Sequence, residues 1–371
     1  MKKIIWLLAI ILLISTSTSS TSPSDPVAGH CTIFTAAIGE TVLFGNSEDY
    51  FLENTFIWFV PAQATTHGYC VVGFDENNDP ADGWPQGGMN DQGLCLDANG
   101  LPPVTLAAQP SRTPYPYGFD WFNYFLRSSS TVEDIIKFRQ THGFYQDMEI
   151  SWQEHWADST GSAVVVSVGT DEDWAFTRMD NSTFLVSTNW NLANPENGWY
   201  PCGRYETATL MLASITQEEE LTVAAFRDIL DAVHQEGLYA SQYSNIFDIV
   251  NRDIYLYHYY NFDKAVKLNL DDELTKGAHR YKIAELLEND SIISSSPSSN
   301  PASEPPSEPS SSPITHSHSS SVSSLPPSSS TSSPGFKIVI AAIGLAMVGT
   351  IAAKRKYNYN SKKKIICKLS K

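Results

Sequence analysis

The chain has 371 residues, and its 41 acidic and 24 basic residues give a net charge of −17 at pH 7. Residues 31–290 alone hold 38 acidic and 13 basic residues, a net charge of −25, whereas residues 354–371 hold eight basic residues and no acidic one. A body this acidic repels polyanions and anionic lipid surfaces, which excludes nucleic acid as a partner.

The first 30 residues predict an export signal and a short propeptide. Lys2 and Lys3 precede eleven apolar residues, too few to cross a bilayer, and a Ser/Thr-rich stretch follows, so residues 1–22 read as a signal peptide. Signal peptidase needs a small residue before its cut, and His30 is not small. We therefore expect a propeptide, 23–30, that a second cut removes, made either by another protease or by the chain itself. His30 also argues against a lipoprotein site at Cys31.

Such a cut would make Cys31 the first residue of the mature chain. A first-residue cysteine carries a thiol nucleophile and a free α-amine, whose pKa near 8 suits a base at neutral pH. The alternative is a buried or disulfide-bonded cysteine at the start of a strand.

Residues 31–290 form a body large enough for one core, without an internal repeat. The apolar pattern and turn residues predict strands at 31–37, 41–46, 55–61, 68–74, 93–98, 162–169, 173–179 and 183–189. Helices are predicted at 119–126, 131–141, 204–213, 223–234 and 281–287, the second starting with a capping box from Ser130 to Glu133. This pattern indicates an α+β fold with two sheets sandwiched by helices.

The remaining residues predict a membrane anchor. Residues 291–334 contain 31 Ser or Pro in 44, which is typical of a disordered stalk. Residues 336–353 are apolar enough for one transmembrane helix, and the basic residues of 354–371 indicate a cytoplasmic tail. The body is therefore expected on the extracellular face of the cell membrane.

Six short segments between residues 31 and 210 form an ordered set of motifs. They are Cys31-Thr32, Phe44-Gly-Asn-Ser-Glu-Asp49, Gly88-Met-Asn-Asp-Gln-Gly-Leu94, His155-Trp-Ala-Asp158 with Gly161, Ser187-Thr-Asn189 and Gly203-Arg-Tyr205. In this order they resemble the N-terminal-nucleophile (Ntn) hydrolases of the choloylglycine hydrolase and penicillin V acylase family, nearest to the carcinine hydrolase and isopenicillin-N acyltransferase-like branch. The resemblance implies a four-layer αββα sandwich and cleavage of linear carbon–nitrogen bonds in small N-acyl amides.

The resemblance also implies roles at the start of the body. Cys31 matches the nucleophile, and Asp49 matches the acid that holds the α-amine of the first residue. Glu48 competes for that role, but adjacent side chains of a strand point to opposite faces, so only one of the two acids can face Cys31. The alternative for Asp49 is a solvated acid that closes the hairpin.

Three further residues match the family. Asn189 resembles the asparagine that stabilises the oxyanion, although a turn-capping role and confusion with Asn191 remain alternatives. Asn99 resembles a second oxyanion donor, about one residue out of register. Arg204 resembles an arginine near the nucleophile, where a cation would lower the thiol pKa, or else it is a surface ion-pair partner.

One departure bears on specificity. Choloylglycine hydrolases usually carry Arg-Asn where this chain has Asn46-Ser47, which makes bile-salt specificity unexpected and leaves the acyl group, and hydrolysis or acyl transfer, open. No metal-binding or nucleotide-binding motif is present, so neither a metal nor a cofactor is predicted.

Cys70, Cys95 and Cys202 allow one disulfide with an odd thiol left over. Two other function classes stay open. A papain-like protease would pair Cys31 with His155 and Asn189, and a non-enzymatic glycan-binding module would use the nine Trp and 17 Tyr.

Overall fold

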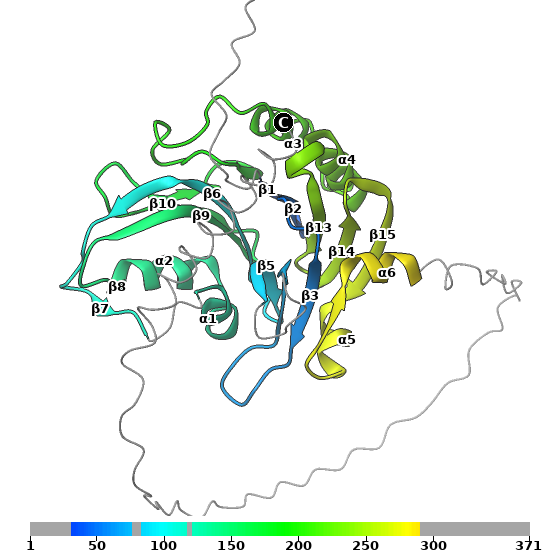
Figure 1. Ribbon diagram of the computed structural model, residues 1–371, viewed down its shortest axis with the longest axis horizontal. Coiled ribbons are helices and arrows are strands. Elements are labelled where there is room, and N and C mark those ends of the chain that lie inside the picture. The colour runs from blue at the N-terminus through cyan, green and yellow to red at the C-terminus, as the bar shows by residue number, and fades with distance from the viewer. Residues whose placement is uncertain (1–30, 76–82, 117–120, 290–371) are drawn as a thin grey trace, which may run out of the picture. The chain divides into compact units, whose positions relative to one another are not determined.

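The computed structural model describes residues 31–75, 83–116 and 121–289 (Figure 1). The chain divides into two units, Met1–Ser295 and Ser296–Lys371, and every described residue belongs to the first. The predicted signal peptide, propeptide, stalk, transmembrane helix and tail lie outside the described residues. Within the described ranges, no helix is long and apolar enough to cross a membrane.

Two antiparallel sheets form the centre of the first unit. The six-stranded sheet has the order β12 (Phe184–Ser187), β1 (Thr32–Ile38), β2 (Thr41–Asp49), β13 (Ser241–Asp248), β14 (Asp253–His258), β15 (Asn261–Asn269). The eight-stranded sheet has the order β11 (Trp174–Arg178), β10 (Ala163–Val168), β9 (Met148–Ala157), β6 (Cys95–Leu106), β5 (Trp84–Asn90), β4 (Tyr69–Phe74), β3 (Thr55–Val60), β16 (His279–Lys282). A small parallel pair joins β7 (Thr113–Pro114) to β8 (His142–Gly143).

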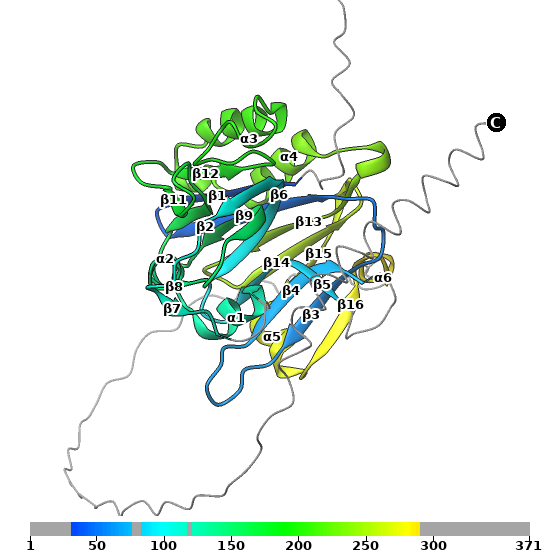
Figure 2. The ribbon, with the colours of Figure 1, turned by 60° about the vertical axis from the view of Figure 1, so that its left-hand side comes forward.

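Helices cover the outer faces of the two sheets (Figures 1 and 2). Helices α1 (Trp121–Ser128) and α2 (Val132–Thr141) pack on the eight-stranded sheet, and α3 (Gly203–Ala213) and α4 (Val223–Val233) pack on the six-stranded sheet. Helices α5 (Leu270–Thr275) and α6 (Ile283–Asn289) contribute to the core between the sheets. The 3-10 helices η1 (Glu218–Glu220) and η2 (Gly237–Tyr239) complete the connections. The predicted αββα layering is therefore present.

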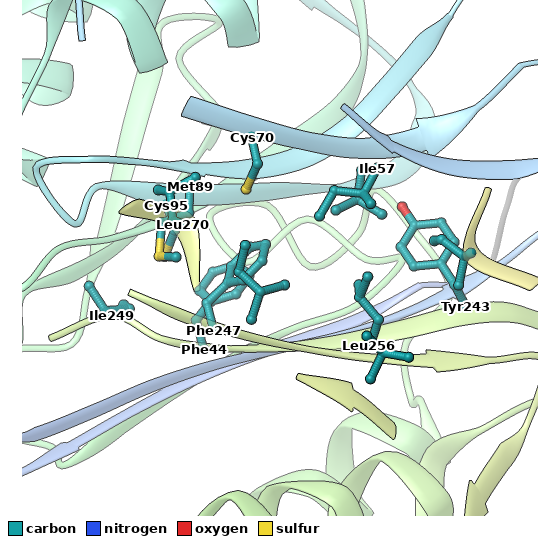
Figure 3. Packing of buried hydrophobic residues seen from close by; sticks show 14 of the residues in the cluster. Phe44, Ile57, Cys70, Met89, Cys95, Tyr243, Phe247, Ile249, Leu256 and Leu270 are labelled. Carbon is teal, nitrogen blue, oxygen red and sulfur yellow. The ribbon is translucent and has the colours of Figure 1, made fainter. Parts of the chain in front are cut away.

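The alternation of side chains along each strand separates three apolar cores. In β1 and β2, Ile33 and Phe44 point between the sheets, whereas Phe34 and Leu43 point toward α3 and α4. Figure 3 shows the central core, where Phe44, Phe247 and Leu256 face residues of the opposite sheet such as Ile57. Burying each such side chain contributes about 1.5–3 kcal/mol to folding.

The eight predicted strands all occur, but the prediction missed others. It did not foresee β5, β9, β13, β14 and β15, nor α5. The predicted helix 281–287 is wrong at its start, because β16 runs to Lys282 and α6 begins only at Ile283. The capping box of α2 lies one residue later than predicted, since the Thr131 side chain caps the helix together with Asp134.

The disulfide that the sequence allowed is absent, because the four described cysteines are all free. Met89 pairs with Cys70 on one side and with Cys95 on the other, so β5 separates the two cysteines (Figure 3). Two strand spacings place their Cα atoms about 10 Å apart, beyond the roughly 7 Å that a disulfide allows. Cys202 lies at the start of α3 and is partly exposed.

Candidate active site

The β1–β2 hairpin fixes where the side chain of Cys31 points. Gly39 adopts a φ of +62° in the tight turn, and Thr32 pairs with Ser47 across the hairpin. Cys31 therefore lies opposite Glu48, and both side chains point between the two sheets.

The thiol of Cys31 is bonded to a carboxyl group. Its Sγ donates to Oε2 of Glu48 over 3.2 Å, and Cys31 is only 2% exposed. Burial, followed by the carboxyls of Glu48, Asp49 and Asp97, raises the pKa of the thiol well above its ordinary value. In the form described, with residue 30 still attached, the thiol is therefore protonated at neutral pH.

Two groups that sequence reasoning missed face the same space. Asp97 is buried on β6, and burial raises the pKa of its carboxyl to about 8. Tyr243 on β13 is fully buried opposite Glu48, and its hydroxyl has no hydrogen-bond partner among the described residues. The sequence could have indicated Asp97 through its spacing. It lies two residues before Asn99, and residues two apart in a strand point to the same face.

Asn99 joins the nucleophile to the second sheet. Its Nδ2 donates to the backbone carbonyl of Cys31 over 3.2 Å, and the side chain is fully buried. Asn99 thus lies at the predicted place beside Cys31, in contact with its main chain.

Asp49 lies on the other face of the hairpin, toward α3 and α4. One carboxylate oxygen, Oδ1, accepts hydrogen bonds from Ser47 over 3.1 Å and from Ser241 over 2.5 Å. Burial raises the pKa of Asp49 to about 7, although the Arg204 charge and the two hydroxyls act to lower it. The acid that touches the thiol in this form is therefore Glu48, whereas the side chain of Asp49 lies on the opposite face of β2.

Arg204, near the start of α3, links Thr32 to two of the predicted site residues, Asp49 and Asn189, on that face. Its Nη1 donates to Oγ1 of Thr32 over 2.8 Å and lies 3.6 Å from Oδ2 of Asp49. Its Nη2 donates to Oδ1 of Asn189 over 2.8 Å. The expected lowering of the thiol pKa does not occur in this form, because burial and three carboxyls raise that pKa and the guanidinium lies on the opposite face of β1.

Asn189 follows β12, the strand that pairs with β1 on its outer side. Besides accepting from Arg204, it donates from Nδ2 to the carbonyl of Gly100 over 3.0 Å. Asn189 thus connects α3 with β6, next to Asn99. Asn191 has a different task, because its Nδ2 donates to the carbonyl of Val168 over 2.8 Å.

The residues of the two other function classes are arranged differently. Both ring nitrogens of His155 are hydrogen-bonded. Nε2 lies 3.0 Å from Oγ1 of Thr35, and Nδ1 lies 2.9 Å from Oγ of Ser187. Burial lowers its pKa to about 3, so it is neutral and does not form the pair with Cys31 that a papain-like protease needs. For the glycan-binding module, the described residues expose aromatic side chains that include Tyr145, Tyr200 and Tyr259.

Other motif residues have structural tasks. The amide of Asn90 donates to the carbonyls of Leu126 and Ser129, both over 2.8 Å, and so fixes the end of α1. Asp158 accepts from the backbone N–H of Val132 at the start of α2 over 2.8 Å. The described residues include no group of three His, Cys, Asp or Glu side chains that could hold a metal ion.

No family model matches the chain, and no curated protein is similar to it in sequence at a significant level. Solved structures do match. A mutant of conjugated bile acid hydrolase from Clostridium perfringens is 15% identical over 67% of this chain and 96% of its own, with a TM-score of 0.52. A second variant of that enzyme is 16% identical over 68% and 97%, with a TM-score of 0.51.

Penicillin V acylase from Agrobacterium tumefaciens is 13% identical over 62% of this chain and 82% of its own, with a TM-score of 0.46. At this level of identity the likeness concerns the fold. The described body of this chain therefore has the layered fold of conjugated bile acid hydrolase.

Proposed function

We propose that this protein is a cysteine Ntn hydrolase that cleaves linear amide bonds of small N-acyl amides through a thioester at Cys31. The observation that carries the proposal is the position of Cys31. It precedes the first strand of a sandwich with this fold, and Asn99 from the other sheet binds its carbonyl over 3.2 Å. A cut before Cys31 would turn its backbone nitrogen into a free α-amine at the same place.

The chemistry follows from that α-amine. It takes the thiol proton, and the thiolate attacks the amide carbon of the substrate. The resulting ammonium returns the proton to the leaving amine, which leaves a thioester between the acyl group and Sγ. Water then hydrolyses the thioester and restores the thiol. An amine in place of water would make the same site an acyltransferase.

Asn99, Asn189, Asp49 and Arg204 have supporting roles in this proposal. The two asparagine amides would stabilise the oxyanion, each contributing on the order of 3 kcal/mol in a site without water. Asp49 would keep the α-ammonium charged and oriented. Arg204 would hold Asp49 and Asn189 in place through the contacts described above.

We further propose that the enzyme acts outside the cell, held by the apolar segment 336–353 with the basic residues 354–371 in the cytoplasm. The support is the sequence alone, namely the leader-like first 22 residues and the charge of the last 18.

The experiment is an amidase assay on the chain cut before Cys31. The panel contains N-acyl amino acids, β-lactam side-chain amides, aminoacyl amines and, because of the structural likeness, conjugated bile acids. We expect turnover of at least one class and a loss of about a thousandfold or more in Cys31→Ala, since the only bond-making group is removed. Cys202→Ala is the matched control and should retain turnover. A folded Cys31→Ala chain with wild-type turnover would refute the proposed nucleophile.

A further inference from the structure

The carboxyl group of Glu48 is the acid in contact with the Cys31 thiol. The two residues are direct neighbours across the hairpin, and Sγ lies 3.2 Å from Oε2. Both side chains are at most 2% exposed, so solvent does not mediate the contact. In the proposed enzyme the α-amine activates the thiol. The hydrogen bond between the thiol and Glu48 therefore has no role in turnover.

The uncut chain needs a different base, because the nitrogen of Cys31 is then an amide and cannot take a proton. We propose that Glu48 is the general base that activates the Cys31 thiol for self-cleavage of the bond between residues 30 and 31. This inference rests on the proposed function, because it explains how Cys31 becomes the first residue.

The surroundings of Glu48 allow it to hold or release a proton. Burial and the Asp97 charge raise its pKa, the hydrogen bond from the Cys31 thiol lowers it, and the Asp49 charge raises it. The titratable groups that face it are the Cys31 thiol, Asp97 and the Tyr243 hydroxyl, while the charge of Arg204 lies beyond β1 on the face of Asp49. Two buried carboxyls without a facing cation resist ionising together, so the pair loses its first proton only at raised pH and then offers one carboxylate as a base.

The proposed step balances as follows. Glu48 takes the proton from Sγ, and the thiolate forms a bond to the carbonyl carbon of residue 30. The bond from that carbon to the nitrogen of Cys31 breaks, and the nitrogen receives the proton from Glu48. Water then hydrolyses the thioester, which releases the carboxylate of residue 30 and restores the thiol.

The experiment follows self-cleavage of the full chain, synthesised in a purified, protease-free translation system with detergent. Intact mass records the loss of residues 1–30 over time. We expect the wild-type chain to be cut, Cys31→Ala to stay intact, and Glu48→Gln to be cut roughly a hundredfold more slowly, because the amide keeps the shape but is not a base. Glu48→Asp should restore part of the rate.

Two further measurements separate a proton-transfer role from a structural one. The cleavage rate should rise with pH as the carboxyl pair loses its first proton, and Asp97→Asn should move the midpoint to lower pH by about one unit, because a like charge beside Glu48 is removed. Amidase turnover of Glu48→Gln is measured in a chain synthesised with Cys31 as its first residue. The fold-loss of turnover should be at least ten times smaller than the fold-loss of cleavage rate, because the α-amine is then the base.

Wild-type cleavage rates in Glu48→Gln, an unchanged midpoint in Asp97→Asn, or equal losses of cleavage and turnover would each overturn the inference. Cleavage of Cys31→Ala would overturn it as well, because the cut would then not depend on the thiol. Failure of the amidase panel beside Glu48-dependent cleavage would refute the proposed substrate class and leave this inference intact.

Discussion

The two faces of the β1–β2 hairpin bury acidic side chains in different surroundings. On the face between the sheets, Glu48 and Asp97 lie beside the Cys31 thiol with no cation bonded to them among the described residues. On the face toward the helices, Asp49 has two serine hydroxyls and the guanidinium of Arg204. The acids of the first face can therefore exchange a proton with the thiol, whereas Asp49 on the second face is held by hydrogen bonds and an ion pair.

This difference follows from the alternation of a strand, not from distance along the chain. Glu48 and Asp49 are neighbours in sequence, yet each belongs to a different layer of the sandwich. One strand separates the two faces, and the Asp49 charge still acts across it, because it raises the pKa values of Cys31 and Glu48. The predictions below test that separation on the helix face.

The largest effect is expected at Arg204. Arg204→Ala removes the hydrogen bonds to Thr32 and Asn189 and leaves the Asp49 carboxylate buried without its cation. Breaking a buried pair in this way costs about 3–5 kcal/mol in the free energy of unfolding. Urea denaturation of the folded body measures the loss. Arg227→Ala, which removes an exposed pair with Asp228, is the control and should leave the free energy of unfolding nearly unchanged.

A loss below about 1 kcal/mol in Arg204→Ala would contradict the view that the helix face is a tightly coupled network. Arg204→Lys should fall between wild type and Arg204→Ala, because an ammonium keeps the charge but lacks the fork that reaches two partners at once.

The second effect concerns pH. Asp49 has a pKa of about 7 in the folded chain and an ordinary value of 3.8 when unfolded, so folding favours its protonated form. Its contribution to stability is therefore fully present below about pH 4 and is lost as pH rises to about 7. The side chain of Asp49→Asn has no proton to lose in this interval. Its free energy of unfolding should therefore fall less than that of the wild type, and the difference should be on the order of 2 kcal/mol.

Unfolding curves between pH 4 and pH 8 test this prediction, with the exposed Asp263→Asn as the matched control. A pH dependence in Asp49→Asn that parallels the wild type would show that the ionisation of Asp49 is not the source. The acids of the other face contribute to the remaining slope, since burial also raises the pKa values of Glu48 and Asp97.

The apolar strands of this fold were predictable, whereas two polar strands near the site, β9 and β13, were not. Strand β10, Ala163–Val168, is mostly valine and buried throughout, so its composition indicates a central strand. Strand β13 is buried almost throughout although its sequence is Ser-Gln-Tyr-Ser-Asn-Ile-Phe-Asp, and β9 contains the buried polar residues Gln153, Glu154 and His155. Polar residues buried by tertiary contacts give no hydropathy signal.

The same reason limits what the sequence says about the candidate site. The motif order placed Cys31, Asp49, Asn189 and Arg204 within one region, and the alternation rule showed that only one of Glu48 and Asp49 could face the thiol. Which of them does so depends on the register of the hairpin, in which Ile38 pairs with Thr41 across a two-residue turn. Asp97 comes from the other sheet, so only tertiary packing brings it to the thiol.

The smallest effect is expected at Ser47, on the helix face. Ser47→Ala removes one hydroxyl from Asp49, while the hydrogen bond from Ser241 remains. The loss should be about 1 kcal/mol in the free energy of unfolding, and it should grow above pH 7, where Asp49 is ionised and needs the donor more. Ser128→Ala, an exposed serine bonded to the carbonyl of Tyr124, is the control. If Ser47→Ala were equally destabilising at pH 5 and pH 8, the hydroxyl would act through packing and not through the Asp49 charge.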